Sequence, residues 1–310
     1  MDTLKPQLNI HSSSEKTALI AACGAGVMWG TGALVVNILV GQYGFTPENV
    51  SFWRFVIGAV VLIGIFGRGI MWTRLRPLLL TVILAGTAMA GYVLLWFLGI
   101  KHMGPAVPTL IALCLPPVIV TIIGIARGQE VADLQLLLVL SGAILGTVLI
   151  INRHGAATAD VDSHNTLLGV VFSIGSALLY AGFSMISGKI SIALGAGQAT
   201  ACLTVIAAIV MGLTSLLKPL TWPTEFPPQA WFLYLGLVTA ALALLAFNWG
   251  AARLKPTALT IATLLEPLTA VVLSALILGQ YFGLLQWIGS SFLLLSIWGL
   301  NRRALEKGKS

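Results

Sequence analysis

Ten separate runs of about 20 apolar residues constrain the fold of this chain more than any other feature. They lie at about 17–40, 49–66, 77–98, 105–125, 134–151, 166–187, 196–217, 230–250, 257–278 and 283–300. A helix needs about 20 apolar residues to cross a bilayer, and inside lipid it satisfies every backbone polar group within its own segment. The pattern therefore predicts an all-α integral membrane protein with ten transmembrane helices.

The composition excludes the main soluble alternatives. Charged residues make up 9% of the 310 residues and hydrophobic residues 58%, whereas soluble domains carry roughly 25% charged residues. We therefore expect the lipid bilayer as a partner, and we exclude a soluble enzyme and a nucleic-acid-binding protein. Cys23, Cys114 and Cys202 lie inside apolar runs and show no metal-ligand spacing, so we expect no cofactor and no metal.

The basic residues predict the orientation of the chain in the membrane. With a cytoplasmic N-terminus, 13 of the 17 Lys and Arg residues fall on the cytoplasmic side, and Lys101, Arg153 and Lys218 fall outside. Cytoplasmic loops of membrane proteins carry such an excess of positive charge. We therefore expect both termini in the cytoplasm, with residues 1–16 and 304–310 as short tails.

An internal repeat divides the chain into two halves. An offset of 151 residues aligns 99–129 with 250–280 and pairs Pro105 with Pro256 and Pro116 with Pro267. We predict a first repeat at 17–152, an external linker at 153–165 and a second repeat at 166–303, each repeat with five helices. Because five is odd, the two repeats insert in opposite orientations. Inverted repeats are typical of secondary transporters, whose substrate site lies near the midplane between the repeats.

Several motifs resemble those of a known transporter family. They are "MWGTG" at 28–32, "WRF" at 53–55, "GPAVPTLIALCLPPVIVTIIGIARGQE" at 104–130 and its second-half counterpart "KPTALTIATLLEPLTAVVLSALILGQ" at 255–280. The chain resembles the drug/metabolite transporter superfamily, in its ten-helix branch with two EamA-type repeats, and within that branch the bacterial amino-acid exporters of the YddG type. The resemblance implies export of a metabolite across the bacterial inner (plasma) membrane. Members of the superfamily carry amino acids, cationic drugs, nucleotide sugars or phosphorylated sugars.

The chain departs from this family at one acidic position. Family members often end the fourth and ninth helices with a Gly-Glu pair. Here the first repeat has Gly128-Gln129-Glu130 and the second has Gly279-Gln280-Tyr281. Because the acid is displaced in one repeat and lost in the other, we assign it no role.

Glu266 is the strongest candidate for a transport residue. It lies about halfway along the ninth run, where a charge costs on the order of 2.5–3.5 kcal/mol at the helix centre. With Thr260, Thr263, Ala270 and Ser274 it forms a stripe of small and polar residues at helical spacing, and we expect this stripe to face the bundle interior. Glu266 either binds a substrate ammonium group, carries a coupling proton, or is a protonated structural acid bonded to a neighbouring helix.

Arg54 is the other charged residue within a run. It lies about one turn into the second run from the outer side. One interpretation is a contact with a substrate carboxylate, because guanidinium matches carboxylate geometry. The alternatives are snorkelling to the outer headgroups and a structural pair with an acid in a loop.

Aromatic residues supply candidate walls for the substrate site. Tyr92 and Trp96 share one helix face, and Trp29 and Tyr180 are related by the repeat and lie beside small residues. Asn248 lies near the end of the eighth run. Such side chains enclose aromatic or cationic ligands, but Trp and Tyr also anchor helices at membrane interfaces.

These features together predict a secondary transporter that exports amino acids, including aromatic ones, by alternating access. The expected partner is a small-molecule substrate, and protons are a candidate coupling ion. An exporter of hydrophobic cations, or of another small metabolite, is the alternative. An intramembrane enzyme would need paired catalytic groups at depth, and the runs hold one acid. A channel is not separable from a carrier by sequence.

Overall fold

The computed structural model describes residues 5–103, 106–151, 163–216, 219–278 and 283–307. In these residues the chain is helical and contains no β-strand, which confirms the predicted all-α class. The helices are α1 (Lys5–Gly41), α2 (Pro47–Phe66), α3 (Trp72–Leu75), α4 (Leu79–Met103), α5 (Ala106–Ala126), α6 (Leu134–Ile151), α7 (Ser163–Leu194), α8 (Ala196–Gly212), α9 (Pro228–Tyr234), α10 (Ala243–Ala251), α11 (Pro256–Ala262), α12 (Leu265–Leu278) and α13 (Leu284–Lys307).

Short helical segments complete or join these helices. Three 3₁₀ segments are η1 (Gly67–Gly69), η2 (Arg76–Leu78) and η3 (Leu213–Leu216), and a π-helical segment, η4 (Leu235–Leu242), joins α9 to α10. In the described part of the chain, nine helical stretches are long and apolar enough to cross a membrane. The tenth, α8, has 17 residues, which is at the lower end of spanning length. The chain is thus an integral membrane protein of ten helices.

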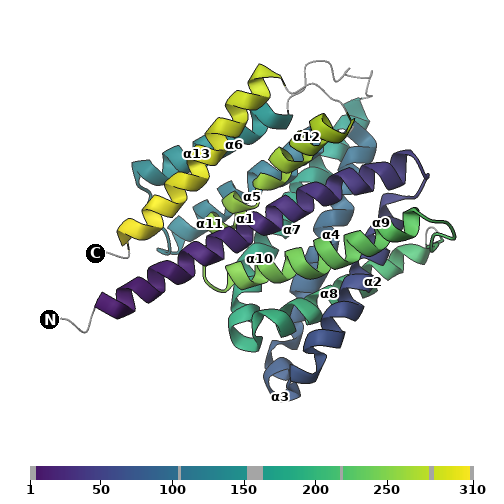
Figure 1. The fold of residues 1–310 in the computed structure, drawn as a ribbon, viewed down its shortest axis with the longest axis horizontal. Coiled ribbons are helices and arrows are strands. Elements are labelled where there is room, and N and C mark those ends of the chain that lie inside the picture. The colour runs from purple at the N-terminus through teal and green to yellow at the C-terminus, as the bar shows by residue number, and fades with distance from the viewer. Residues whose placement is uncertain (1–4, 104–105, 152–162, 217–218, 279–282, 308–310) are drawn as a thin grey trace.

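The helix packing reflects the two repeats. The first repeat consists of α1, α2, α4, α5 and α6, and the second of α7, α8, α9–η4–α10, α11–α12 and α13. The main contacts between the repeats have counterparts in which the roles of the two repeats are exchanged. For example, α4 packs against α7, and its counterpart, η4 with α10, packs against α1. Likewise, α5 packs against α7, and its counterpart α12 packs against α1. The equivalent helices α6 and α13 pack on each other at one edge of the molecule (Figure 1). This is the two-fold pattern of an inverted repeat.

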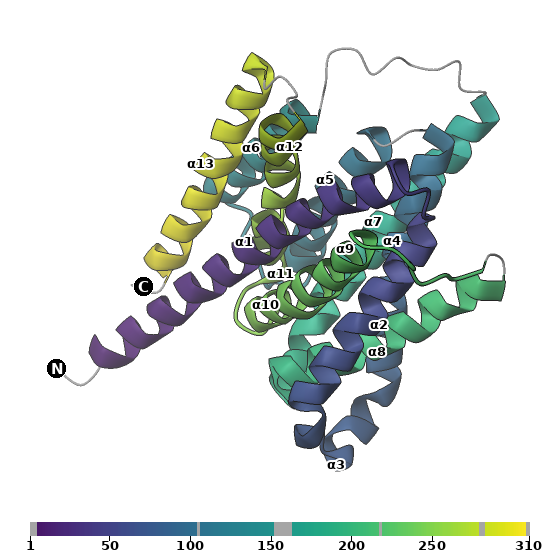
Figure 2. The ribbon, with the colours of Figure 1, turned by 45° about the vertical axis from the view of Figure 1, so that its right-hand side comes forward.

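Helix boundaries differ from the sequence prediction mainly at the two ends and at the linker. α1 begins at Lys5, within the expected tail 1–16, and its 37 residues give a length of about 55 Å, well beyond the hydrocarbon thickness. α13 continues to Lys307, into the expected tail 304–310. In both views the start of α1 and the end of α13 lie at the same end of the bundle (Figures 1 and 2). Residues 153–162 of the predicted linker 153–165 lie outside the described residues. Its last residues belong to α7, which begins at Ser163.

Proline explains why the ninth span consists of two helices. Pro267 has no N–H to donate to the carbonyl of Thr263, and its ring crowds that carbonyl. The chain accordingly leaves the α-helix after Ala262, Leu264 donates its N–H to Ile261 at 3.1 Å, and α12 begins at Leu265. Pro116 and Pro117, by contrast, lie inside an uninterrupted α5. Among the described residues, proline therefore interrupts the span in the second repeat and not in α5 of the first, and Pro105 lies outside the described residues.

Candidate functional site

Five aromatic rings from four helices form a connected cluster in the centre of the bundle. Tyr180 of α7 lies 5.1 Å from Tyr92 of α4 and 6.3 Å from Phe247 of α10, measured between ring centroids. Phe247 in turn lies 5.4 Å from Phe183 and 5.5 Å from Trp29 of α1. Pairs at these separations are attractive. The cluster therefore joins α1, α4, α7 and α10, which belong to both repeats.

Hydrogen bonds connect this cluster to the two irregular segments of the second repeat. The hydroxyl groups of Tyr180 and Thr263 lie 3.0 Å apart, and Thr263 is the residue at which the ninth span breaks. The indole N–H of Trp29 donates to the carbonyl of Thr239 in the π-helical segment at 3.0 Å. π-Helical turns occur frequently at functional sites, and broken helices form many transporter sites.

Two glycines bring α1 against the break in the ninth span. A Cβ atom on Gly26 would lie 2.9 Å from the carbonyl oxygen of Thr263, and one on Gly30 would lie 2.5 Å from the carbonyl oxygen of Glu266. Any side chain at these positions would push the helices apart. The Gly-x-x-x-Gly spacing therefore serves close helix packing, and it does so beside the candidate site.

Glu266 lies in the first turn of α12 rather than in the middle of a continuous helix. Its backbone N–H donates to the carbonyl of Thr263 at 3.0 Å. A helix N-terminus carries a partial positive charge, which stabilises a carboxylate in the first turn. The break that Pro267 causes therefore offsets part of the cost of holding an acid within the membrane.

Arg54 of α2 lies near Glu266 in the fold. It interacts electrostatically with both Glu266 and Tyr92, and its guanidinium carbon lies 4.8 Å from the ring centroid of Phe55. The Nε atom of Arg54 is buried and has no hydrogen-bond partner. Arg54 and Glu266 form no ion pair with each other in the described structure. An arginine and a glutamate therefore lie within electrostatic range of each other without a direct ion pair.

Trp96 and Asn248 lie apart from this arrangement. The indole N–H of Trp96 donates to the Thr109 hydroxyl of α5 at 3.1 Å. Asn248 is fully buried, and its side-chain amide donates to the Thr200 hydroxyl of α8 at 3.0 Å. Both side chains thus bond to helices outside the aromatic cluster, and their role in substrate binding stays a prediction.

Sequence reasoning did not select Phe183, Phe247 or Thr239 as site residues. Phe183 follows Tyr180 by three residues and so shares its helix face, a signal that was present in the sequence. Thr239 contributes a backbone carbonyl within a π-helical segment. No side-chain pattern reveals such a carbonyl.

Comparison with known proteins places the chain in a family. The EamA-like transporter family matches residues 16–152 and 167–302, which is most of the chain and two copies of the family's unit. The protein belongs to this family of membrane transporters, which confirms the resemblance of its motifs to EamA-type transporters. The finer resemblance to exporters of the YddG type stays a prediction.

Two relatives from Bacillus subtilis (strain 168) support the transporter class. The chain is 26% identical over 225 residues to the uncharacterized transporter YwfM, covering 70% of this chain and 71% of that protein. It is 25% identical over 222 residues to the uncharacterized transporter YcbK, covering 70% of both chains. A crystal structure of 19% sequence identity superposes with a TM-score of 0.78 over 93% of this chain and 98% of the other, and it shows the same fold.

Proposed function

We propose that this protein is a secondary transporter that exports amino acids, including aromatic ones, across the bacterial inner membrane by alternating access. One observation carries this proposal: Arg54 and Glu266 interact electrostatically within a single aromatic-walled site, yet they form no ion pair. An amino acid is a zwitterion whose two charged groups complement this pair. The family membership supports transport, and the site supports the choice of substrate.

The proposed binding mode assigns one substrate group to each charge. The substrate carboxylate accepts hydrogen bonds from the Arg54 guanidinium, whose buried Nε lacks a partner, and the planar guanidinium matches a carboxylate. The substrate ammonium group lies against the Glu266 carboxylate. Holding unpaired charges away from water is costly. A zwitterion that pairs with both Arg54 and Glu266 is therefore favoured over a ligand that pairs with only one of them.

The aromatic cluster supplies the surface for the substrate side chain. Tyr92 and Tyr180 lie beside each other at 5.1 Å, and Tyr92 interacts with Arg54 and Glu266. Rings in this position stack favourably on aromatic substrates and accept aliphatic ones. Breadth of specificity follows, because ring faces contribute apolar contact without demanding one shape.

A hydrophobic cation is the rival substrate, and matched ligands separate the two. A cation would use Glu266 and the rings, but Arg54 would repel it. We propose measuring transport into proteoliposomes with phenylalanine and with phenethylamine, which lacks only the carboxylate, with and without a pH gradient. We expect transport of phenylalanine and little of the amine. Transport of the amine alone would refute amino-acid export and establish the cation exporter.

Two charge-neutral variants test the binding mode. A hydrogen bond to a charged group is worth about 1.5–3 kcal/mol, which corresponds to a factor of about 10–150 in affinity at 1.36 kcal/mol per tenfold. We expect Glu266→Gln and Arg54→Gln each to weaken phenylalanine transport by such a factor. The exposed residues Glu225 and Arg74 provide matched controls as Glu225→Gln and Arg74→Gln, which we expect to transport normally.

Glu266 also allows a test against a purely structural role. If Glu266 binds substrate or couples protons, Glu266→Gln keeps the fold and its melting temperature, and transport falls or loses its dependence on pH. If Glu266 is only structural, Glu266→Gln transports normally, and Glu266→Leu loses both stability and transport. Unchanged uptake and unchanged pH dependence in Glu266→Gln would overturn its proposed role.

A further inference from the structure

A cavity lies between the repeats, apart from the aromatic cluster. It has a volume of about 250 Å³ and is lined by residues of both halves, among them Gly124, Glu130, Ser184, Lys255 and Thr257. Its walls come from the end of α5, the C-terminal third of α7 and the junction between α10 and α11. The positive-inside distribution predicts that the loops at this end face the cytoplasm.

The end of α5 positions an acid at the mouth of this cavity. Gly128 has a φ of +67°, and the N–H of Gln129 donates to the carbonyl of Gly124 at 2.8 Å while that of Gly128 donates to Ile125 at 2.9 Å. These bonds form a Schellman cap, in which glycine adopts the left-handed conformation at low cost. The cap turns the chain back over the helix end, which places Glu130 against the second repeat.

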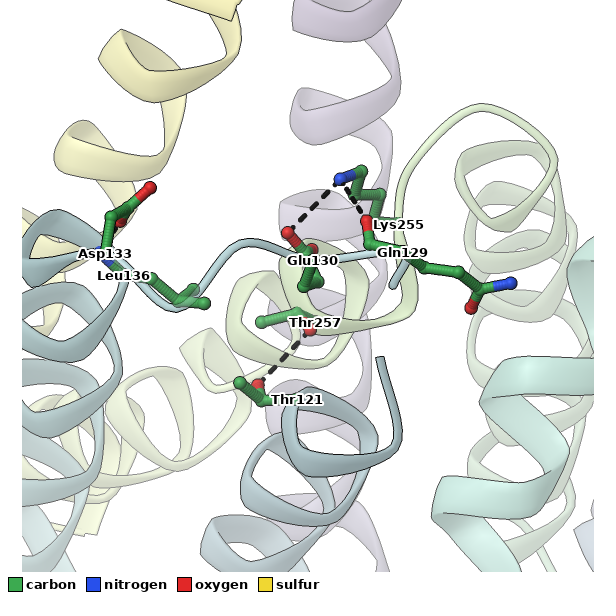
Figure 3. Close-up of polar contacts among 7 residues, drawn as sticks. All are labelled: Thr121, Gln129, Glu130, Asp133, Leu136, Lys255 and Thr257. Carbon is green, nitrogen blue, oxygen red and sulfur yellow. Dashed lines mark hydrogen bonds and ion pairs between the residues drawn. The ribbon is translucent and has the colours of Figure 1, made fainter. Parts of the chain in front are cut away.

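Lys255 of the second repeat bridges to this turn (Figure 3). Its ammonium Nζ lies 3.2 Å from the Glu130 Oε2 atom and 2.5 Å from the backbone carbonyl oxygen of Gln129. The Glu130 side chain is only 8% exposed, whereas Lys255 is 51% exposed. Below this pair the Thr121 hydroxyl donates to the Thr257 hydroxyl at 3.2 Å. Two polar links thus join α5 to α11 across the repeat boundary.

Two helices, α7 and α11, connect the cavity to the aromatic cluster. Ser184 lines the cavity and donates its hydroxyl to the backbone carbonyl of Tyr180 at 2.8 Å. Thr257 lines the cavity on α11, and Thr263, at the end of the same helix, contacts the Tyr180 hydroxyl. About one turn of α7 and two turns of the ninth span therefore separate the cavity from the candidate substrate site.

We propose that this cavity is the cytoplasmic vestibule of the transport path, and that the Glu130–Lys255 ion pair is a latch that holds the two repeats together at its mouth. This inference rests on the proposed transport function but not on the identity of the substrate. The latch breaks when the repeats separate at this end and forms again when they close. The Lys255 side of this ion pair is half exposed, and an ion pair open to solvent is worth about 1 kcal/mol or less, which suits a contact that must break in every cycle.

The test measures opening directly rather than transport. Met185 lines the cavity. In a protein whose Cys23, Cys114 and Cys202 are replaced by serine, a cysteine introduced by Met185→Cys reports how accessible the cavity is. The labelling rate with a charged maleimide is measured on the full chain in detergent without substrate, so neither the topology nor the substrate is assumed. We expect Lys255→Met and Glu130→Gln each to raise the rate about two- to fivefold, the range that such an ion pair supplies.

Two further variants decide between a latch and a general disturbance. The charge swap Glu130→Lys with Lys255→Glu should return the rate toward that of the unswapped protein, because the pair can form in reverse. Arg127→Met removes a positive charge from the same exposed turn without breaking the pair, and its rate should not change. An unchanged rate in Lys255→Met, or an equal rise in Arg127→Met, would overturn the latch. Failure of phenylalanine transport with a working latch would refute only the proposed substrate.

Discussion

Replacing Gly30 by alanine should loosen the contact between α1 and α12 and lower stability. A Cβ atom at this position would lie 2.5 Å from both the Glu266 carbonyl oxygen and the Thr269 Cβ atom. Ordinary van der Waals contact begins at about 3.4 Å, so the two helices would have to separate by roughly 0.9 Å. The neighbouring atoms include backbone, which cannot rotate away as a flexible side chain can.

The size of the effect follows from two opposing terms. Overpacking of a close contact costs about 1–3 kcal/mol, and replacing glycine by alanine inside a helix contributes about 0.8–1 kcal/mol in the opposite direction. Gly24 lies on the same helix, and no atom lies within 4 Å of the position that a Cβ atom would take there, so Gly24→Ala experiences only the favourable term. We therefore expect Gly30→Ala to be less stable than Gly24→Ala by about 1–3 kcal/mol.

Thermal unfolding of both variants in the same detergent measures this difference. We expect the melting temperature of Gly24→Ala to equal or exceed that of the unmodified protein, and that of Gly30→Ala to fall below it. Transport by Gly30→Ala should also fall, because α1 carries Trp29 and α12 carries Glu266. Equal melting temperatures for the two alanine variants would refute the claim that Gly30 is required for close packing at the break.

Two further predictions concern the site and the topology. Thr263→Val removes the hydroxyl partner of Tyr180 and should lower the free energy of unfolding by about 1–3 kcal/mol. The control Thr147→Val removes a hydroxyl that bonds only within its own helix and should lower the melting temperature less. Equal losses in the two variants would contradict the role of the Tyr180 contact. In a background without native cysteines, an impermeant maleimide should label Glu225→Cys from outside and Arg68→Cys only from the cytoplasmic side, and reversed labelling would disprove the predicted orientation.

Part of the candidate site could be read from single helices. Glu266 stood out because an acid within an apolar run is costly, and Trp29 and Tyr180 stood out because the repeat relates them and small residues flank them. The sequence did not reveal that Pro267 divides the span and places Glu266 in the first turn of α12. Nor did it reveal that Glu130, to which the sequence assigned no role, pairs with Lys255 across the repeat boundary.

Helical spacing alone could not decide which residues meet. Tyr92 and Trp96 share a helix face, yet Tyr92 contacts Tyr180 of α7 and Trp96 bonds to Thr109 of α5. Asn248 follows Phe247 directly, but it points to α8 while Phe247 joins the aromatic cluster. Periodicity specifies the face of one helix, whereas a site depends on which faces of several helices converge.

The amino-acid sequence by itself determined the all-helical class, the number of spans, the two repeats and the transporter family. The physical reason is that a bilayer imposes on each spanning segment a length, an apolar composition and complete internal hydrogen bonding, and each of these can be read locally. Only the tertiary structure decided that Arg54 and Glu266 come within electrostatic range of each other and of Tyr92, and that Glu130 meets Lys255. Those contacts join residues of different helices that lie far apart in the chain, and they depend on close helix packing that no local pattern encodes.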